Sequence, residues 1–237
     1  MGNAQHLKRH VAPVAWPIKR KNITFIAKPN PGSHKLKYST CVLILLRDVL
    51  KYGETAKEVK LIVHNKEVLV NGKKISDVKF PVGLFDVFEI KDTKERYTLL
   101  FDEVGKIKLV NTKDNTIYLK VSKKTITPGK KYQLNFMNGF NAFVDEKSFK
   151  STKVNDTVVY DLDKKKSLST INLKQGVYAY IFDGKFQGHF GLIKEFVSYN
   201  GLTKDVTHIE IDGVVHTTAK DYCFAIGTKK EDLKSFE

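Results

Sequence analysis

Apolar side chains recur at helical spacing in two neighbouring stretches early in the chain. In the first, between residues 42 and 52, one face of a helix would carry Leu43, Leu46, Val49 and Leu50. Gly53 follows at the point where such a helix ends. Thr55 and Glu58 then have the spacing of a capping box, in which each side chain accepts a hydrogen bond from the other residue's amide. The pattern predicts two short helices, the second with Ala56, Val59, Ile62 and Val63 facing inward.

A strand–turn–strand pattern follows the second helix. Residues 68–70 are apolar and favour a strand, and Asn71-Gly72 is a strong signal for a two-residue hairpin turn. A closing strand is expected over residues 85–90. The order predicts a small module of two helices, a hairpin and a further strand.

Short β-like stretches dominate the rest of the chain. Turn residues separate them at 102–105, at Pro128-Gly129 and at Asn138-Gly139. This spacing indicates a small β domain instead of alternating strands and helices. Further strands within residues 176–196 and 206–227 would close a compact barrel. The expected strands before these cover residues 97–101, 107–110, 117–121, 132–136 and 158–161.

The first 40 residues have no regular pattern. Four prolines, at positions 13, 17, 29 and 31, each disfavour a regular helix or central strand at their position. Scattered apolar residues indicate an extended arm pinned by a few contacts, and these anchors are Val11, Val14, Trp16, Phe25 and Ile26. The alternative is a flexible basic tail that keeps the protein soluble.

Charge is distributed unevenly along the chain. The first acidic residue is Asp48, and residues 1–47 contain nine Lys and Arg. The whole chain has 41 basic and 26 acidic side chains, so residues 48–237 contribute 32 minus 26, or +6, of the net +15. Unbalanced like charge repels itself in a compact state, whereas each Lys or Arg that docks on a phosphate backbone releases a counterion. The distribution favours nucleic acid as the partner, although basic composition alone also fits an anionic membrane surface.

Several other classes of protein are disfavoured. The apolar run at residues 41–46 is too short to span a bilayer, and no apolar segment follows the basic N-terminus as in a secretory signal. Cys41 and Cys223 have no partners at zinc-binding spacing and are expected to be reduced core thiols. We find no phosphate-binding loop, nucleophile elbow or catalytic triad order among the seven histidines. We therefore expect no enzymatic activity, metal, cofactor or small-molecule substrate.

Two segments resemble known RNA-binding modules. Residues 46–90 resemble an S-four RNA-binding domain, in which the two-helix face and the hairpin lie against structured RNA. Residues 176–196 resemble a KOW motif, the strand–loop–strand of small barrels in ribosomal proteins and elongation factors, with glycines at 184, 188 and 191.

The chain as a whole resembles the archaeal and eukaryotic type of small-subunit ribosomal protein number four. The matching pieces are residues 6–9, 12–13, 16, 29–35, 45–48, 50–52, 57–59, 70–73, 77, 80–83, 86–87, 153–157 and 224–227. The resemblance implies an α+β, mainly β, structural component of the ribosome with four parts. These are a basic extended N-terminal arm over residues 1–40, an S-four domain over 41–92, a central β domain over 93–170, and an SH3-like KOW barrel over 171–237.

The resemblance also implies which residues bind ribosomal RNA. Trp16 either stacks on a base or packs into the protein's own core, and the other residues contact phosphates, bases or a folded RNA junction. The expected RNA-binding residues are Lys8, Arg9, His10, Trp16, Lys19, Arg20, Lys21, His34, Lys35, Lys37, Arg47, Lys51, Lys57, Lys60, Asn71, Gly72, Lys73, Lys74, Lys185 and His189.

Some positions depart from the family pattern. Ser33 replaces a proline, and His189 stands where the KOW segment normally has an arginine, close to the additional acidic residue Asp183. The resemblance therefore implies a divergent, shortened member with weakened distal contacts.

The expected partners are small-subunit rRNA and neighbouring ribosomal proteins, without a membrane. The expected location is the cytoplasmic ribosome, with nucleolar assembly if the source is eukaryotic. The alternatives are an RNA-modifying enzyme that borrows the S-four module and a KOW-bearing translation or transcription factor that binds reversibly.

Overall fold

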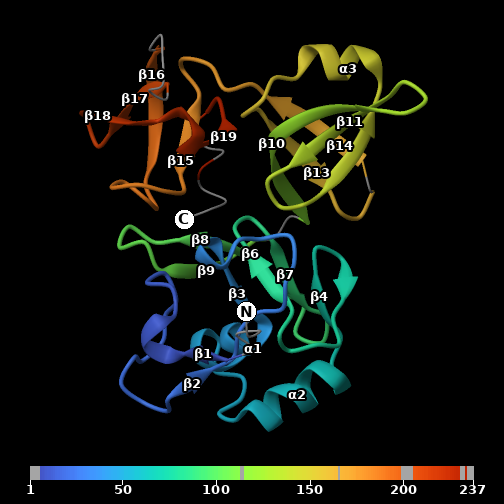
Figure 1. Ribbon diagram of the computed structural model, residues 1–237, viewed down its shortest axis with the longest axis vertical. Helices are drawn as coiled ribbons and strands as arrows, with labels where there is room; N and C mark the ends of the chain where they lie inside the picture. Colours follow the sequence, from blue (N-terminus) through green and yellow to red (C-terminus); the bar gives the residue numbers. More distant parts are fainter. Residues whose placement is uncertain (1–5, 113–114, 165, 199–204, 230–232, 234–237) are drawn as a thin grey trace, which may run out of the picture. The chain divides into compact units, whose positions relative to one another are not determined.

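The chain folds into two compact units that consist mainly of β-strands with a few short helices (Figure 1). The computed structural model describes residues 6–112, 115–164, 166–198, 205–229 and 233. The first unit comprises residues 1–101 and 105–115, and the second comprises 102–104 and 116–237. The expectation of a mainly β fold is confirmed. The finer division into four parts is untested and stays a prediction.

The N-terminal segment is part of the core of the first unit. Strand β1 (Leu7–Lys8) pairs antiparallel with β2 (Phe25–Ile26), and β3 (Ser39–Cys41) pairs antiparallel with β6 (Pro81–Gly83). Short 3-10 turns lie between them at η1 (Arg9–Val11) and η2 (Leu36–Tyr38). The expected anchors are only partly correct, because Trp16 and Ile26 are buried whereas Val11, Val14 and Phe25 are exposed.

The first predicted helix forms, but with a wider turn and an earlier end. It consists of α1 (Val42–Ile44) and the π-helical turn η3 (Leu45–Val49), which the Leu50 amide closes by donating to the Leu45 carbonyl. Lys51 takes the left-handed conformation, with φ 58°. Gly53 was expected to end the helix, but it is buried beside the second helix, where an added Cβ would lie 3.3 Å from a Val59 methyl. Close packing explains this glycine better than a positive φ.

The second helix, α2 (Ala56–Asn65), begins with the predicted capping box. The Thr55 hydroxyl accepts from the Glu58 amide at 3.3 Å, and the Glu58 carboxylate accepts from the Thr55 amide at 3.5 Å. Val59 and Val63 are buried as expected, whereas Ala56 is exposed and Ile62 is half-buried. The buried stripe is therefore narrower than the predicted one, and a larger part of α2 faces solvent.

A five-stranded antiparallel sheet in the order β5-β4-β7-β8-β9 completes the first unit. Asn71 and Gly72 have φ of 50° and 73° and form the predicted hairpin turn between β4 and β5. The Ile107 amide donates to the Ala15 carbonyl and so ties β9 to the N-terminal segment. The strands are β4 (Val68–Val70), β5 (Lys73–Lys74), β7 (Val87–Ile90), β8 (Glu95–Phe101) and β9 (Ile107–Asn111).

The second unit begins with a sheet in the order β12-β11-β10-β13-β14, with helix α3 (Glu146–Ser151) (Figure 1). The expected strands here form, but β12, α3 and β14 were missed. Five of the six residues of β14 are exposed, so no apolar alternation marks this strand in the sequence. The strands are β10 (Thr116–Thr127), β11 (Lys131–Phe136), β12 (Asn141–Val144), β13 (Thr157–Asp161) and β14 (Lys166–Ile171).

The other sheet of the second unit has the order β18-β17-β16-β15-β19. Its core contains Ala179, Ile181, Ile193, Ile209 and Cys223. The 3-10 turn η4 (Lys220–Tyr222) precedes the last strand. The strands are β15 (Tyr178–Ile181), β16 (Phe190–Val197), β17 (Val206–Ile211), β18 (Val214–Ala219) and β19 (Cys223–Gly227).

A buried lysine joins the two sheets of the second unit. Lys120 on β10 is 4% exposed, and its ammonium donates to the carbonyls of Asp221 at 2.6 Å and Cys223 at 2.7 Å. Burial lowers the pKa of Lys120 to about 8, and the nearby Cys223 and Asp221 offset part of this effect. The two hydrogen bonds satisfy a charge that would otherwise be costly to remove from water.

Cys41 and Cys223 are both buried free thiols. Burial raises the pKa of each to about 11. Among the helices that the structure describes, none combines the length and apolar character needed to cross a membrane.

Candidate nucleic-acid interface

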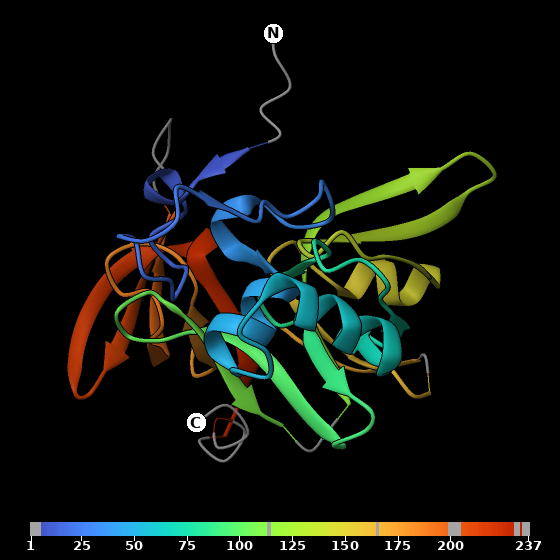
Figure 2. The ribbon, with the colours of Figure 1, turned by 90° about the horizontal axis from the view of Figure 1, so that it is seen from below.

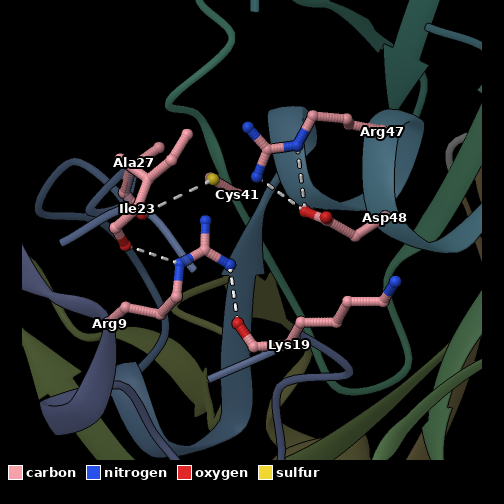
Figure 3. A network of polar contacts seen from close by, with 7 residues as sticks. All are labelled: Arg9, Lys19, Ile23, Ala27, Cys41, Arg47 and Asp48. Atoms are coloured by element: carbon pink, nitrogen blue, oxygen red, sulfur yellow. Dashed lines mark hydrogen bonds and ion pairs between the residues drawn. The ribbon is translucent and has the colours of Figure 1, made fainter. Parts of the chain in front are cut away.

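Two arginines organise the N-terminal segment by donating to backbone carbonyls, and Figure 3 shows the contacts of one of them, Arg9. The Arg9 guanidinium donates to the carbonyls of Ile23 and Lys19, both at 3.0 Å, and Arg9 is buried. Arg20 donates to the carbonyls of His10 at 3.0 Å and Pro13 at 3.1 Å, while remaining half-exposed. Arg9 therefore shapes the loop and does not present its side chain to a phosphate, contrary to expectation, whereas Arg20 keeps part of its surface accessible.

Trp16 packs in the core of the first unit. It is 2% exposed, and its indole N–H donates to the Ser39 carbonyl at 2.8 Å. The structure thus decides between the two roles considered for Trp16: the side chain is internal and has no face available for a base.

The buried carboxylate of Asp86 links the N-terminal segment, which contains His34, to the β4–β5 turn and to β7. Asp86 is 2% exposed and accepts from His34 Nε2 at 2.7 Å, from the Gly83 amide at 2.8 Å and from the Asn71 side chain at 2.9 Å. Asn71 in turn accepts from the Val87 amide at 2.9 Å. His34 and Asn71, both expected to contact RNA, instead link the N-terminal segment, the hairpin turn and β7.

Sequence patterns did not single out Asp86 for this role. Its partners come from three separate stretches of the chain, so no local spacing marks it. The only signal was its place among the residues that match the family. Asp86 positions the neighbouring basic groups and does not itself offer a surface to an anion.

Exposed lysines cover the helical part of the first unit. Lys57 and Lys60 lie on the solvent side of α2, and Lys51 is exposed just after η3. Arg47 is partly exposed and donates to the Asp48 carboxylate at 2.8 Å and 3.2 Å. Since the pair is only about one-fifth exposed, Arg47 keeps a fixed orientation (Figure 3).

The hairpin tip carries further exposed positive charge. Gly72, Lys73 and Lys74 are all exposed at the turn and on β5. Lys74 lies 3.6 Å from Glu67, which makes a closer ion pair of 2.6 Å with Lys91. The tip therefore presents two ammonium groups next to a backbone that turns tightly.

Several acidic side chains of this region are engaged by local partners, although Glu54 is exposed. Asp86 is buried, Asp48 is paired with Arg47, and Glu58 caps α2. Hydrogen bonding to the Glu54 amide lowers the pKa of Glu58, and the contact with Lys91 lowers the pKa of Glu67. These carboxylates are bound to local donors, so the exposed lysines outnumber the exposed carboxylates on the surrounding surface.

The N-terminal segment adds more accessible basic groups. Six of its expected contact residues are exposed, namely Lys8, His10, Lys19, Lys21, Lys35 and Lys37. Lys37 has its ammonium 5.3 Å from the centre of the Tyr38 ring. Most of the predicted contacts are thus exposed side chains of the first unit.

The expected contacts in the second unit are sparser. Lys185 is exposed, with its ammonium 5.6 Å from the centre of the Phe186 ring. His189 is half-buried, and its Nδ1 is shielded from solvent without a hydrogen-bond partner among the described residues. Asp183 accepts from the Gly184 amide at 2.8 Å. Among the described residues of the loop between β15 and β16, Lys185 is therefore the one exposed cation.

The structure also bears on metal chemistry. Within the described ranges, His, Cys, Asp and Glu side chains form no cluster of three or more that could hold an ion.

Comparison with known families gives two matches within the chain. The RS4NT (NUC023) domain matches residues 1–37, which include the basic N-terminal segment. The ribosomal family S4e matches residues 93–167, which include much of the β10–β14 sheet.

Similar proteins extend the match over nearly the whole length. The small ribosomal subunit protein eS4 of Methanocaldococcus jannaschii is 35% identical over 240 residues, covering 98% of each chain. The protein of the same name from Methanococcus maripaludis is 36% identical over 233 residues, covering 95% of each. The crystal structure of the 30S ribosomal protein S4e from Thermoplasma acidophilum has a TM-score of 0.69 and 30% identity, covering 81% of this chain and 97% of that one.

Proposed function

The chain belongs to the ribosomal protein eS4 family, also called S4e, and we propose that the exposed basic groups of its first unit bind small-subunit ribosomal RNA. As a member of this family it is a structural constituent of the small ribosomal subunit and not an enzyme. Its place is therefore the ribosome, next to rRNA and other ribosomal proteins.

One observation carries the RNA-binding proposal. Lysines on the helices, the hairpin tip and the N-terminal segment are exposed, whereas Asp86 is buried, Asp48 is paired with Arg47 and Glu58 caps α2, which leaves Glu54 as an exposed carboxylate among the lysines of the helical part. An RNA backbone gains from such a surface through counterion release. We call these side chains the basic surface: Lys8, His10, Lys19, Arg20, Lys21, Lys35, Lys37, Arg47, Lys51, Lys57, Lys60, Lys73 and Lys74, together with the Gly72 backbone.

The buried members of the predicted set have a supporting role in this proposal. Arg9, Trp16, His34 and Asn71 fix the segments that carry the basic surface. Their substitution would weaken RNA binding by loosening the backbone, not by removing a contact. Recognition by shape and phosphate contact suits a folded RNA.

The finer architecture is also part of the proposal. The helix–helix–hairpin region would be an S-four domain, residues 93–170 a central β domain, and the sheet β18-β17-β16-β15-β19 an SH3-like KOW barrel. Lys185 would add a contact from the barrel loop, with His189 supporting the loop from a half-buried position. Direct protein neighbours within the subunit would complete the assembly.

The test measures the salt dependence of RNA binding. A chain with Lys57→Gln, Lys60→Gln, Lys73→Gln and Lys74→Gln keeps the fold, because all four side chains are exposed. For binding to small-subunit rRNA, its slope of log affinity against log salt should fall by about 3, since each phosphate contact contributes roughly 0.7 to 0.9.

The matched control neutralises four exposed lysines of the second unit: Lys147, Lys164, Lys166 and Lys174. It should leave the slope close to wild type. Equal effects from both sets would contradict a specific role for the basic surface and reduce it to general charge attraction.

A second measurement separates a ribosomal constituent from the two alternative functions. The tagged chain should remain in the small-subunit peak after a high-salt sucrose cushion, because buried contacts supplement its phosphate contacts. Loss with salt would favour a reversible factor or an RNA-modifying enzyme. Deleting residues 1–40 is a poorer test, because it removes Trp16 and Ser39 from the core of the first unit.

A further inference from the structure

A second acid-free stretch of sequence forms the longest hairpin of the second unit. Between Asp114 and Asp145 the chain contains five lysines and no acidic residue. This stretch forms β10, β11 and β12, and the β10–β11 turn at Pro128-Gly129 lies at the outer end of the sheet (Figures 1 and 2). None of its residues was among the expected RNA contacts.

The strand register sorts the side chains of this hairpin into two faces. Residues that pair directly across antiparallel strands lie on the same face. One face therefore consists of three cross-strand rows: Lys123, Asn135 and Asn141; Thr125, Gln133 and Phe143; and Thr127 with Lys131. We call this the open face. The other face carries Lys124, Ile126, Tyr132 and Leu134.

Helix α3 covers part of the other face. The Phe149 ring lies 4.9 Å from the Tyr132 ring, measured between centroids, and the Lys124 ammonium lies 4.4 Å from the Phe149 centroid. Lys124 also donates to the carbonyls of Phe149 and Thr152 near the end of α3. The charge of Lys124 is thus engaged in holding the helix on this face.

The open face combines an aromatic ring with amides and cations. Phe143 is 68% exposed, although burial of an aromatic side chain is normally favourable. Lys123, Lys131 and Asn141 are exposed beside it. Side-chain hydrogen bonds of 2.8 Å join Thr125 to Asn135 and Asn135 to Asn141, so the amides are held in a fixed row across three strands.

We propose that the open face binds an unpaired stretch of ribosomal RNA. A base would stack on Phe143, while Gln133 and Asn141 would donate to or accept from base edges and 2′-hydroxyls. Lys123 and Lys131 would neutralise flanking phosphates, with Lys130 at the turn extending the path. The inference rests on the proposed function, because it adds a second RNA contact to a ribosomal protein.

The chemistry of the face favours unpaired RNA over other occupants. A base inside a duplex is stacked on its neighbours, so it could not cover the exposed Phe143 ring. The acid-free stretch is complementary to a polyanion, and its amide row offers both donors and acceptors. A protein partner would cover Phe143 as well, and the experiment below distinguishes it from RNA.

The experiment places a fluorescent ring on either face of the same hairpin. Phe143→Trp puts an indole on the open face, and Ile126→Trp puts one on the opposite face at a position that is 63% exposed. Trp16 is buried in the other unit and gives the same background in both. The probes are a ten-nucleotide oligouridine and a double-stranded RNA of about 16 base pairs.

We expect oligouridine to quench the fluorescence of the Phe143→Trp chain but not that of the Ile126→Trp chain, because a stacked base contacts only the former. The duplex should quench neither. Phe143→Ala should weaken oligouridine binding about fivefold or more, and Phe143→Tyr should restore it. Quenching that is absent, or equal at both positions or with both probes, would overturn the inference.

The proposed function and this inference fail in different ways. If Phe143→Ala chains sediment with the small subunit but the quenching at position 143 is absent, only the inference is refuted, and the face would be assigned to a neighbouring protein. If the wild-type chain does not enter the subunit, the proposed function itself fails, whatever the oligonucleotides show.

Discussion

Replacing Lys120 by methionine tests whether a buried charge links the two sheets of the second unit. Burial lowers the pKa of Lys120 to about 8 from its usual value of 10.5. Between these two values the unfolded chain holds the proton and the folded chain does not. Unfolding therefore takes up a proton, and the free energy of unfolding rises with pH across this window.

The size of the effect follows from the two pKa values. From pH 7 to pH 9 the folded lysine loses most of its proton and the unfolded one loses almost none. At roughly 1.4 kcal/mol for each pK unit, the wild-type chain should gain about 1.3 kcal/mol from Lys120 over this range. Lys120→Met has no group to titrate and should lack this gain.

Cysteine titration acts in the opposite direction near the upper end of the window. Burial raises the pKa of Cys41 and Cys223 to about 11, so the unfolded thiols lose protons first and stability falls above about pH 9. Both cysteines are present in both proteins. The contribution of Cys41 therefore cancels when the change in the variant is subtracted from the change in wild type. The contribution of Cys223 cancels only in part, because the Lys120 charge lowers the pKa of Cys223.

Urea unfolding followed by circular dichroism at pH 7 and pH 9 measures this difference, while Trp16 fluorescence follows the first unit separately. Lys124→Met is the matched control, because it removes another lysine that donates to backbone carbonyls but leaves Lys120 in place. The control should keep the wild-type pH response. An equal response from wild type and Lys120→Met would refute the assignment of this buried charge.

Three further substitutions test the packing and capping described above. Gly191→Ala should destabilise the second unit by about 1–3 kcal/mol, because the new Cβ would lie 2.3 Å from an Ile209 methyl; an unchanged thermal unfolding temperature would contradict that contact. Asp86→Asn should lower the free energy of unfolding of the first unit by about 1–3 kcal/mol in urea, since it weakens the acceptor of the His34 and Gly83 hydrogen bonds. An unchanged free energy of unfolding would mean that these hydrogen bonds do not stabilise the unit. Thr55→Ala should lower the stability of the first unit by about 1 kcal/mol through loss of the cap on α2, and Thr55→Ser, which keeps the hydroxyl, should recover most of it.

Local sequence patterns were most reliable where a few neighbouring residues decide the backbone. The Thr55 capping box and the Asn71-Gly72 turn form as predicted, because each depends on residues within one turn of chain. Apolar alternation located most strands for the same reason. The helix end at Lys51 was missed, since the left-handed conformation there replaces the glycine that the pattern favoured.

The sequence predicted which stretches of the candidate interface are rich in basic residues, but not what each of these residues does in the folded protein. The excess of lysine at the N-terminus and on the helices is visible in the sequence, and most of these side chains are exposed. Arg9 was expected to contact a phosphate, and Trp16 was expected either to stack on a base or to pack into the core; both donate to backbone carbonyls inside the protein. Composition shows that a charged or aromatic side chain is present, but not whether that side chain faces solvent or the interior.

The sequence by itself determined the mainly β character, the Asn71-Gly72 turn, the excess of basic residues and the family. Only the tertiary structure decided that His34 binds the buried Asp86, that Lys120 bonds to a carbonyl 103 positions away, and that Phe143 remains on an open face. The physical reason is the separation along the chain between the residues that interact. Periodicity and capping report on neighbours within a turn or a strand, whereas burial and hydrogen-bond partners depend on segments that meet only after the chain has folded.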